Sequence, residues 1–213
     1  MKKKARWYFD YVSPFAYLQS AILGRFERYA DIEFKPVLFA ALLNHCGQKG
    51  PAEIPAKKLH TFRQIVWLAE QHQIPLKLPH AHPFNPLPLL RLSIALGNDA
   101  DIVQALFRYV WVEGHLPTDD GPWAALCRKL GVDEPDEEIA RADVKDTLRR
   151  NTEEAIELGL FGVPTLVVDD WLFWGFDMTD AAVAYLRGDP VFGSAQMKQA
   201  ARLPDGVHRV AVR

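Results

Sequence analysis

The first 38 residues alternate between strand and helix patterns, and this alternation constrains the fold more than any other feature of the sequence. The aromatic run Arg6–Phe9 predicts a short buried strand, and Asp31–Leu38 predicts a second one. Between them, Pro14–Tyr29 is predicted to be an amphipathic helix, because apolar residues recur every four positions from Leu18 to Phe26 and a proline suits the first helical turn. A strand–helix–strand unit of this length implies parallel strands with a right-handed crossover.

From roughly Ala40 to Leu158 the pattern becomes helical, and strand character returns only near the C-terminal end. There, Pro164–Val168 and Trp171–Trp174 predict an antiparallel hairpin, a helix follows over Thr179–Arg187, and the tail after Gly188 is predicted to be irregular. The expected class is therefore α/β, with a βαβ half and a ββα half separated by a helical block. The predicted helices of that block are Leu59–Gln73, Pro88–Gly97, Asp101–Gly114, Pro122–Gly131 and, as one or two charged helices, Asp136–Leu158.

Composition narrows the class of protein. With 49% hydrophobic and 24% charged residues, the 213-residue chain can bury a core. Its 25 basic and 27 acidic side chains create no large positive field, so we expect no nucleic-acid partner. The longest apolar run, Val37–Leu43, is too short to cross a bilayer, and Asp10 and Pro14 interrupt any signal peptide. Cys46 and Cys127 fit neither a disulfide framework nor zinc-ligand spacing, so we expect a cytoplasmic protein.

Ser13, immediately before Pro14, stands at a predicted strand-to-helix junction. Its hydroxyl would ordinarily only cap a backbone N–H of the helix, which contributes about 1 kcal/mol. In the same place it could instead donate a hydrogen bond to a bound thiolate or oxyanion, because a helix N-terminus favours negative charge. No adjacent base is evident, which argues against Ser13 as an acyl-transfer nucleophile. The pattern by itself favours the cap.

Two further segments leave alternatives open. The Val163-Pro164 bond is either an ordinary trans bond opening a strand or a cis bond that leaves the Val163 backbone free to pair with a peptide ligand. Asp177, just before the last helix, is by default a first-turn acid, but its carboxylate could hold a ligand's ammonium group.

The pair His80 and His82 lacks matching acid or cysteine spacing, so loop histidines are favoured over a metal site.

Taken in order, the segments FDYVSPFAYL (9–18), FGVPT (161–165) and WGFDMTD (174–180) resemble the 2-hydroxychromene-2-carboxylate isomerase family, which is similar to kappa-class glutathione transferases and, more distantly, to DsbA-like oxidoreductases. The likeness covers nearly the whole chain. It implies a thioredoxin-like fold, residues 1–39 and 159–213, carrying a large all-helical insertion, residues 40–158. It also implies a homodimer, with glutathione as the cofactor and a small aromatic molecule as the substrate.

The resemblance assigns roles residue by residue. Ser13 matches the catalytic serine that holds the glutathione sulfur, at the position of the first cysteine of the oxidoreductases' CxxC motif; with no sulfur in this segment, disulfide exchange by that motif is excluded. Val163 would pair with the cysteinyl part of glutathione, and Pro164 would be the cis-proline. Asp177 matches the acid that binds the γ-glutamyl end.

Within the insertion, Lys57 matches a lysine that would face the glycyl carboxylate, and Asn85 resembles an asparagine near the substrate pocket. The proline-rich segment around Asn85 would form a pocket wall. Two positions depart from the family pattern. Gln48 stands where an asparagine is usual, and Phe176 and Met178 flank Asp177 where the family often has Asn or Ser and Arg. Met178 thus removes a cation that could contact a carboxylate.

The function implied is a glutathione-dependent isomerase of aromatic catabolism that interconverts 2-hydroxychromene-2-carboxylate and trans-o-hydroxybenzylidenepyruvate. A thiolate would add to the conjugated substrate, allow rotation about the former double bond, and leave again. Two alternatives remain: a kappa-like glutathione transferase, in which the thiolate stays attached to an electrophile, and a non-catalytic thioredoxin-fold protein that binds peptides at Val163.

Overall fold

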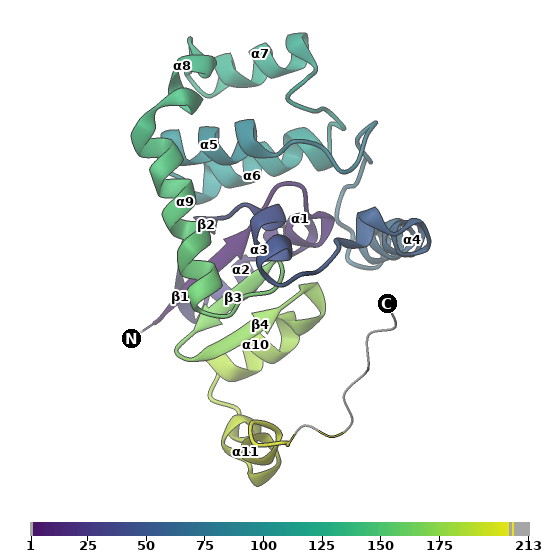
Figure 1. Ribbon diagram of the computed structural model, residues 1–213, viewed down its shortest axis with the longest axis vertical. Helices are drawn as coiled ribbons and strands as arrows, with labels where there is room; N and C mark the ends of the chain where they lie inside the picture. Colours follow the sequence, from purple (N-terminus) through teal and green to yellow (C-terminus); the bar gives the residue numbers. More distant parts are fainter. Residues whose placement is uncertain (1, 205, 207–213) are drawn as a thin grey trace.

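A four-stranded mixed sheet lies at the centre of the computed structural model, which describes residues 2–204 and 206 (Figure 1). The strand order is β2-β1-β3-β4. β1 (Lys3–Phe9) pairs in parallel with β2 (Ala30–Pro36) and antiparallel with β3 (Thr165–Val168), and β3 forms a hairpin with β4 (Trp171–Trp174). The predicted parallel pair and the predicted hairpin are both confirmed, and β1 joins the two halves of the fold.

The crossover between β1 and β2 differs from the prediction. One helix over Pro14–Tyr29 was expected, but the chain forms α1 (Pro14–Ser20) and a short α2 (Gly24–Glu27). At the break, the N–H groups of Ile22 and Leu23 bond to carbonyls three residues back, and the Ser20 hydroxyl bonds to the Tyr17 carbonyl at 2.7 Å. These tighter local bonds replace the α-helical pattern and separate the two helices.

The helices predicted between the strands are confirmed to within a few residues at each end. Asp136–Leu158 resolves into two helices, α8 and α9. The helices of this block are α3 (Phe39–His45), α4 (Pro55–Gln71), α5 (Leu87–Ala95), α6 (Ala100–Trp111), α7 (Asp120–Lys129), α8 (Pro135–Ala140) and α9 (Ala142–Glu157), with a 3₁₀ turn at Pro51–Glu53.

The tail after Gly188 was expected to be irregular, and this was wrong. After α10 (Thr179–Leu186), the chain forms a 3₁₀ turn (Pro190–Gly193) and the helix α11 (Ala195–Ala200). Ser194 caps α11 by accepting a hydrogen bond from the Met197 N–H at 3.2 Å. The rest of the predicted tail, residues 205 and 207–213, lies outside the described residues.

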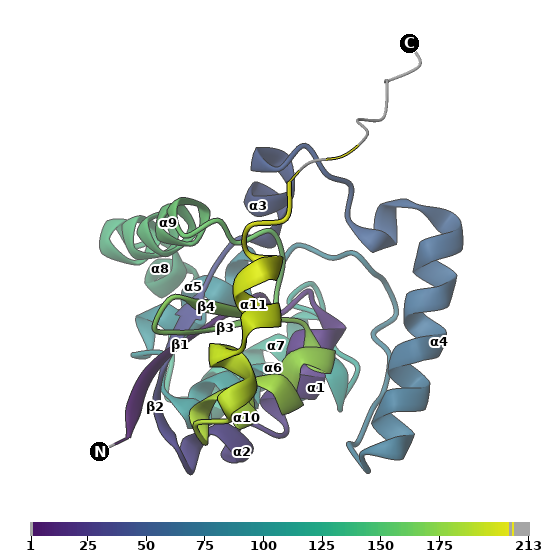
Figure 2. The same cartoon turned by 90° about the horizontal axis from the view of Figure 1, so that it is seen from below.

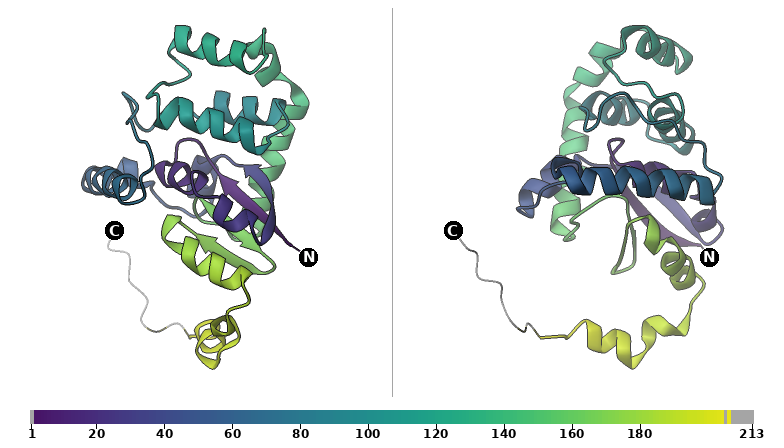
Figure 3. Two further views of the ribbon diagram at one scale, coloured as in Figure 1. Left: turned by 180° about the vertical axis from the view of Figure 1, so that it is seen from behind. Right: turned by 90° about the vertical axis from the view of Figure 1, so that its right-hand side faces the viewer.

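Both faces of the sheet are covered, which explains why β1 is apolar on both sides. Trp7 and Phe9 point into a large core that includes Leu89, Phe107 and Trp111 from the helical block. Tyr8, on the opposite face, belongs to a smaller cluster with residues of α3 and α9. Figures 2 and 3 show α3 and α9 on one side of the sheet, and α5, α6 and α7 stacked beyond α1.

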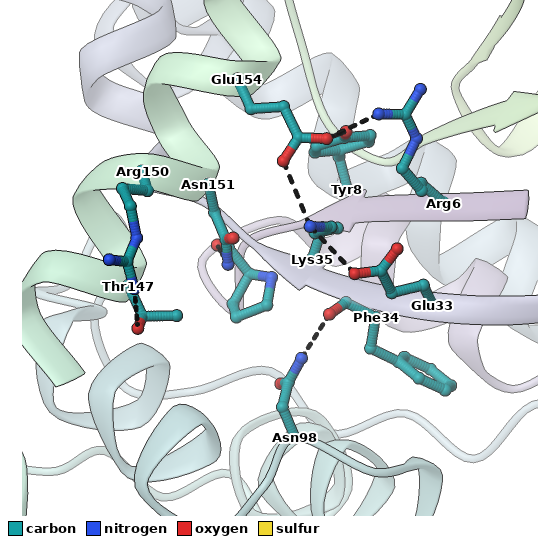
Figure 4. Close-up of polar contacts among 11 residues, drawn as sticks. Arg6, Tyr8, Glu33, Phe34, Lys35, Asn98, Thr147, Arg150, Asn151 and Glu154 are labelled. Carbon is teal, nitrogen blue, oxygen red and sulfur yellow. Dashed lines mark hydrogen bonds and ion pairs between the residues drawn. The ribbon is translucent and has the colours of Figure 1, made fainter. Parts of the chain in front are cut away.

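An ionic network fastens α9 to the strands (Figure 4). The Glu154 carboxylate accepts hydrogen bonds from Arg6 at 2.6 Å, from the Tyr8 hydroxyl at 2.8 Å and from Lys35 at 3.2 Å. Lys35 also pairs with Glu33 at 2.9 Å. Because Arg6 and Tyr8 lie on β1 and Lys35 on β2, one carboxylate of α9 holds two neighbouring strands.

The helix α4 runs along the side of the molecule, beside α1, and forms a wall over the region where β1 ends (Figures 1 and 2). Within the described residues, the structure has no helix with the length and apolar character that a membrane span requires.

Candidate functional site

Ser13 is the N-cap of α1, as its sequence position predicts. Its Oγ accepts a hydrogen bond from the Ala16 N–H at 3.2 Å and donates one to the Val163 carbonyl at 3.3 Å. The second distance is long for an O–H···O bond, which is usually about 2.7–2.8 Å. The Ala16 N–H thus fixes the hydroxyl oxygen, while the hydroxyl proton is only weakly engaged.

The Val163-Pro164 peptide bond is cis, one of the two alternatives left open by the sequence. Across it, the Val163 carbonyl faces Ser13, and the Val163 N–H donates no hydrogen bond within the described part of the chain. Gly162 before it admits no side chain, because a Cβ atom there would lie 2.3 Å from the Trp174 indole nitrogen. Trp174 therefore packs directly over the backbone that precedes the cis bond.

Ser13 and Val163 line a cavity of about 520 Å³, which we call the serine cavity. Gln48 and Lys57, both assigned to the cofactor by resemblance, also line it, and Lys49 lies beside them. The cavity is bounded by the β1–α1 loop, by α3 and the loop after it, by the start of α4, and by the proline-rich segment that was expected to form a pocket wall. Its aromatic lining residues are Phe15, Phe39, Phe62, Phe84, Phe161 and Trp174.

A second cavity of about 400 Å³, the aspartate cavity, contains Asp177 and Phe176. It lies between α1 and α2, the inner side of α4 and the loop from Trp174 to Asp180. Phe15, Val163 and Trp174 line both cavities, so the two adjoin along these three residues. The segments singled out from three distant parts of the sequence thus lie around two adjoining cavities.

The buried side-chain amide of Gln19 stabilises the loop that carries Asp177. The Gln19 side chain, 1% exposed, accepts a hydrogen bond from the Trp7 indole at 2.7 Å and donates to the Gly175 carbonyl and to the Thr179 hydroxyl, each at 3.1 Å. Gly175 has a φ of +92°, and a Cβ atom there would lie 2.4 Å from Asp177 Oδ1. The position of the Asp177 carboxylate therefore requires a glycine at 175.

Three of the residues assigned by resemblance line neither cavity. Pro164 is buried behind Val163, whereas Met178 is 37% exposed and lies beyond the aspartate cavity. Asn85 is exposed, and its side-chain oxygen accepts a hydrogen bond from the Leu87 N–H at 3.1 Å near the start of α5. Its neighbours Phe84 and Pro86 do line the serine cavity.

Two titratable groups at the serine cavity were not assigned a site role from the sequence. Asp10 is fully buried three residues before Ser13, and burial raises the pKa of its carboxyl to about 7, although the N–H groups of Phe39 and Val12 donate to it. Burial lowers the pKa of His82, whose Nε2 lies 2.8 Å from the Val12 carbonyl. An acidic residue directly after an apolar strand, as at Asp10, is the signal that could have identified the first group.

His82 and His80 do not meet as a pair. His80 lies 3.8 Å from Asp119, while His82 packs against Phe62 and Trp111. Across the described residues, no three side chains of the His, Cys, Asp or Glu type are grouped so that they could hold a metal ion.

Comparisons with known proteins identify relatives of this chain in sequence and in fold. The family model of the DSBA-like thioredoxin domain matches residues 6–187. A 2-hydroxychromene-2-carboxylate isomerase of Pseudomonas putida is 30% identical over 179 residues, covering 80% of this chain and 88% of the relative. Glutathione S-transferase kappa 2 of Caenorhabditis elegans is 26% identical over 185 residues, covering 79% and 82%. A solved 2-hydroxychromene-2-carboxylate isomerase structure, 24% identical, has a TM-score of 0.71 and covers 95% of this chain and 100% of its own.

Proposed function

Because the chain belongs to the DSBA-like thioredoxin domain family and, within it, to the family of the 2-hydroxychromene-2-carboxylate isomerases, we propose that it is a glutathione-dependent isomerase. Its substrates would be 2-hydroxychromene-2-carboxylate and trans-o-hydroxybenzylidenepyruvate, or a related pair in aromatic catabolism. The observation that carries the proposal is the Ser13 hydroxyl in the serine cavity, 3.3 Å from the carbonyl of Val163, a residue that lines both cavities.

The residues around the two cavities match the polar groups of glutathione. The unused Val163 N–H suits the cysteinyl backbone, as a short β-strand contact beside a cis-proline. Lys57 and Gln48, at the far end of the serine cavity, suit the glycyl carboxylate. In the aspartate cavity, Asp177 suits the γ-glutamyl ammonium, and Phe176 is a further lining residue.

Ser13 would act by holding the sulfur in its ionised form. When bound, glutathione supplies a thiolate that adds reversibly to a conjugated double bond and thereby permits rotation. The Ser13 proton turns from the Val163 carbonyl toward the sulfur, while the Ala16 N–H continues to hold the hydroxyl oxygen. A hydrogen bond donated to the charged form lowers the thiol pKa from its usual value of about 8.5. Phe15, in the first turn of α1, also lines the serine cavity, and an N–H group of a first helical turn has no partner within its own helix.

The aromatic walls of the serine cavity suit a planar aromatic substrate. Phe39, Phe62 and Phe84 lie on its outer side, and Phe161 and Trp174, whose ring centroids are 4.8 Å apart, lie beside Val163. A substrate stacked among these rings would lie beside the sulfur held at Ser13. Asn85, next to two lining residues, stays a predicted substrate contact.

A kappa-like glutathione transferase is the second candidate, and the similarity to the kappa-class relative favours it. It would use the same thiolate site, so only the acceptor and the product distinguish it from an isomerase. The third candidate, a non-catalytic peptide-binding protein, is favoured only by the Val163 N–H, which has no hydrogen-bond partner among the described residues. We also propose that the protein is cytoplasmic, as its cysteine usage suggests, and that it is a homodimer, as the resemblance implies.

The test is calorimetric titration of the wild type and of Ser13→Ala with glutathione, at several pH values and in two buffers of different ionisation enthalpy. We expect the wild type to bind with release of a proton near neutral pH, and the variant to bind without that release. Product analysis with the chromene substrate and with a model electrophile then separates isomerase from transferase. Absence of glutathione binding to the wild type would contradict both.

A further inference from the structure

The aspartate cavity carries charges of both signs, although the sequence lacks the expected cation beside Asp177. Met178 stands where the resemblance leads us to expect an arginine, and it lines neither cavity. The cavity nevertheless contains a guanidinium, that of Arg25 on α2. Its other polar lining residues are Gln64 of α4, His72 directly after α4, Asp177 of the loop before α10, and Thr179 and Asp180 at the start of α10.

Arg25 is available to a ligand. Its Nη2 donates to Asp180 Oδ1 at 2.5 Å, and no other side-chain hydrogen bond or ion pair of Arg25 is found within the described residues. A guanidinium has five N–H donors arranged to match a carboxylate, so most of them stay unused. The Asp180 side chain is 84% exposed, and an ion pair that is so accessible to solvent contributes little to the stability of the fold. A ligand carboxylate could share or displace it at small cost.

The charges of this cavity fit one kind of chemical group. Asp177 and Asp180 together outweigh Arg25 by one negative charge, so a ligand carrying only a carboxylate would be repelled. An α-amino-acid head group has an ammonium and a carboxylate on one carbon, and it would satisfy Asp177 and Arg25 together. Phe15, Ile22 and Leu68 provide apolar contacts for the methylene groups that follow.

We propose that Arg25 binds the α-carboxylate of the γ-glutamyl residue of glutathione and so replaces the cation absent at position 178. The inference rests on the proposed function, because it assigns a residue to the same cofactor. It moves the carboxylate contact from the loop before α10 to α2. The break between α1 and α2, which the sequence pattern did not predict, is what gives Arg25 an element of its own at the edge of the cavity.

The test compares glutathione with 4-aminobutanoyl-cysteinylglycine, which lacks only the α-carboxylate, by calorimetric titration. We expect the wild type to bind glutathione about tenfold more tightly than this analogue, the size expected for one charge-assisted contact. Arg25→Gln should weaken glutathione binding by a similar factor and leave analogue binding unchanged, so that the two dissociation constants become equal. Arg28→Gln, an exposed arginine on the same turn that lines neither cavity, is the matched control and should behave as wild type.

Any other outcome contradicts either the role of Arg25 or the proposed function. If Arg25→Gln keeps the tenfold preference, or weakens both ligands equally, Arg25 does not bind the carboxylate. Asp180→Asn removes the ion pair but keeps the guanidinium of Arg25, so it should preserve the tenfold preference for glutathione over the analogue. If Asp180→Asn loses that preference, the ion pair and not Arg25 by itself recognises the carboxylate. If the wild type binds neither ligand, the proposed function fails, which is a different result from a preference that survives in Arg25→Gln.

Discussion

At the scale of single residues, the hydroxyl of Ser13 serves two neighbours at once. Its oxygen caps α1 through the Ala16 N–H, and its proton faces the Val163 carbonyl across the site. The cap and the thiolate-binding role are therefore compatible, because they use different parts of the same group. A hydroxyl accepts with its lone pairs and donates with its proton.

Ser13→Ala should lower the free energy of unfolding by about 1 kcal/mol, because the Ala16 N–H loses its partner at the start of α1. Ser13→Thr keeps a capping oxygen and should lose markedly less stability. Urea denaturation of the three proteins measures this difference. Equal stability of Ser13→Ala and the wild type would show that the cap contributes nothing, and that the serine is there for the ligand alone.

Asp10 should give the protein a distinctive pH dependence. Burial raises its pKa to about 7 in the folded state, from an ordinary value of 3.8. Between pH 3.8 and about 7 the folded chain therefore holds one proton more than the unfolded chain. The stability contributed by protonated Asp10 is complete below pH 3.8 and is lost as the pH rises toward 7. The free energy of unfolding should fall by up to about 1.4 kcal/mol per pH unit in this window.

Urea unfolding at several pH values between about 4 and about 8 measures that slope, with Asp10→Asn as the comparison. The amide cannot ionise, so the variant should lose this part of the slope, although it also sets an N–H₂ group against one of the N–H donors of Phe39 and Val12. If the free energy of unfolding changes with pH in the same way in the wild type and in Asp10→Asn, the titration does not belong to Asp10.

At the scale of elements, the loop between β4 and α10 depends on a glycine. Gly175→Ala would add a Cβ atom at a φ of +92°, 2.4 Å from Asp177 Oδ1. We expect a loss of about 1–2 kcal/mol of stability, because the backbone conformation is unfavourable for alanine. We also expect weaker glutathione binding, because the carboxylate of Asp177 must move.

The matched control is Gly121→Ala in α7, where a Cβ atom would meet nothing within 4 Å. There alanine favours the helix, so stability should be unchanged or raised by a few tenths to about 1 kcal/mol. Thermal denaturation and glutathione titration of both variants check the pair. Unchanged binding by Gly175→Ala would mean that the position of Asp177 does not matter to the ligand.

The contact of α9 with the sheet should be sensitive to Glu154. Burial opposes ionisation of this carboxyl, but hydrogen bonds from Tyr8, Lys35 and Arg6 outweigh it and hold the pKa below its ordinary value of 4.5. The stabilisation from ionised Glu154 is therefore fully present above pH 4.5 and is lost as the pH falls through the lower pKa of the folded state. Glu154→Gln should cost about 1–2 kcal/mol at neutral pH, after allowance for partial exposure to solvent.

The neighbouring Glu153 provides the control, because its ion pair with Arg149, at 3.0 Å, is exposed. Glu153→Gln should change the free energy of unfolding by less than about 0.5 kcal/mol. Urea denaturation at pH values near neutral and near 4 compares the variants. If the Glu154 and Glu153 variants lose equal stability, the network in Figure 4 does not fasten α9 to the strands.

At the scale of the whole molecule, the strands and the helical block share one core. Trp7 and Phe9 of β1 belong to the same buried cluster as Leu89, Phe107 and Trp111. The division into residues 1–39 with 159–213 and residues 40–158 stays a prediction of chain organisation, but a shared core couples the two parts energetically.

Differential scanning calorimetry should therefore show one cooperative transition for the full chain, with equal calorimetric and van't Hoff enthalpies. Phe107→Ala, in the shared core, should lower the transition temperature without splitting the peak. Two separated transitions would contradict this coupling and would mean that the helical block unfolds on its own.

The sequence alone determined the local structure and much of the site. Hydrophobic periodicity specified the strands and most helix boundaries, because a buried face must recur with the period of its element. The local pattern at Ser13, Val163 and Asp177 left a bland alternative open at each position, and the family resemblance of these motifs was what indicated them as residues of the site. The break after α1 and the helix α11 escaped prediction because short helices depend on a few local hydrogen bonds that periodicity does not report.

Only the tertiary structure decided which side chains meet. Arg25 entered the aspartate cavity and Met178 did not, and the buried Asp10 carboxyl came to accept a hydrogen bond from the Phe39 N–H at the start of α3. None of this follows from spacing, because these contacts join segments that are distant in the sequence and are brought together by packing around the core. Burial and charge pairing between distant segments are properties of that packing, and they set the chemistry of the site.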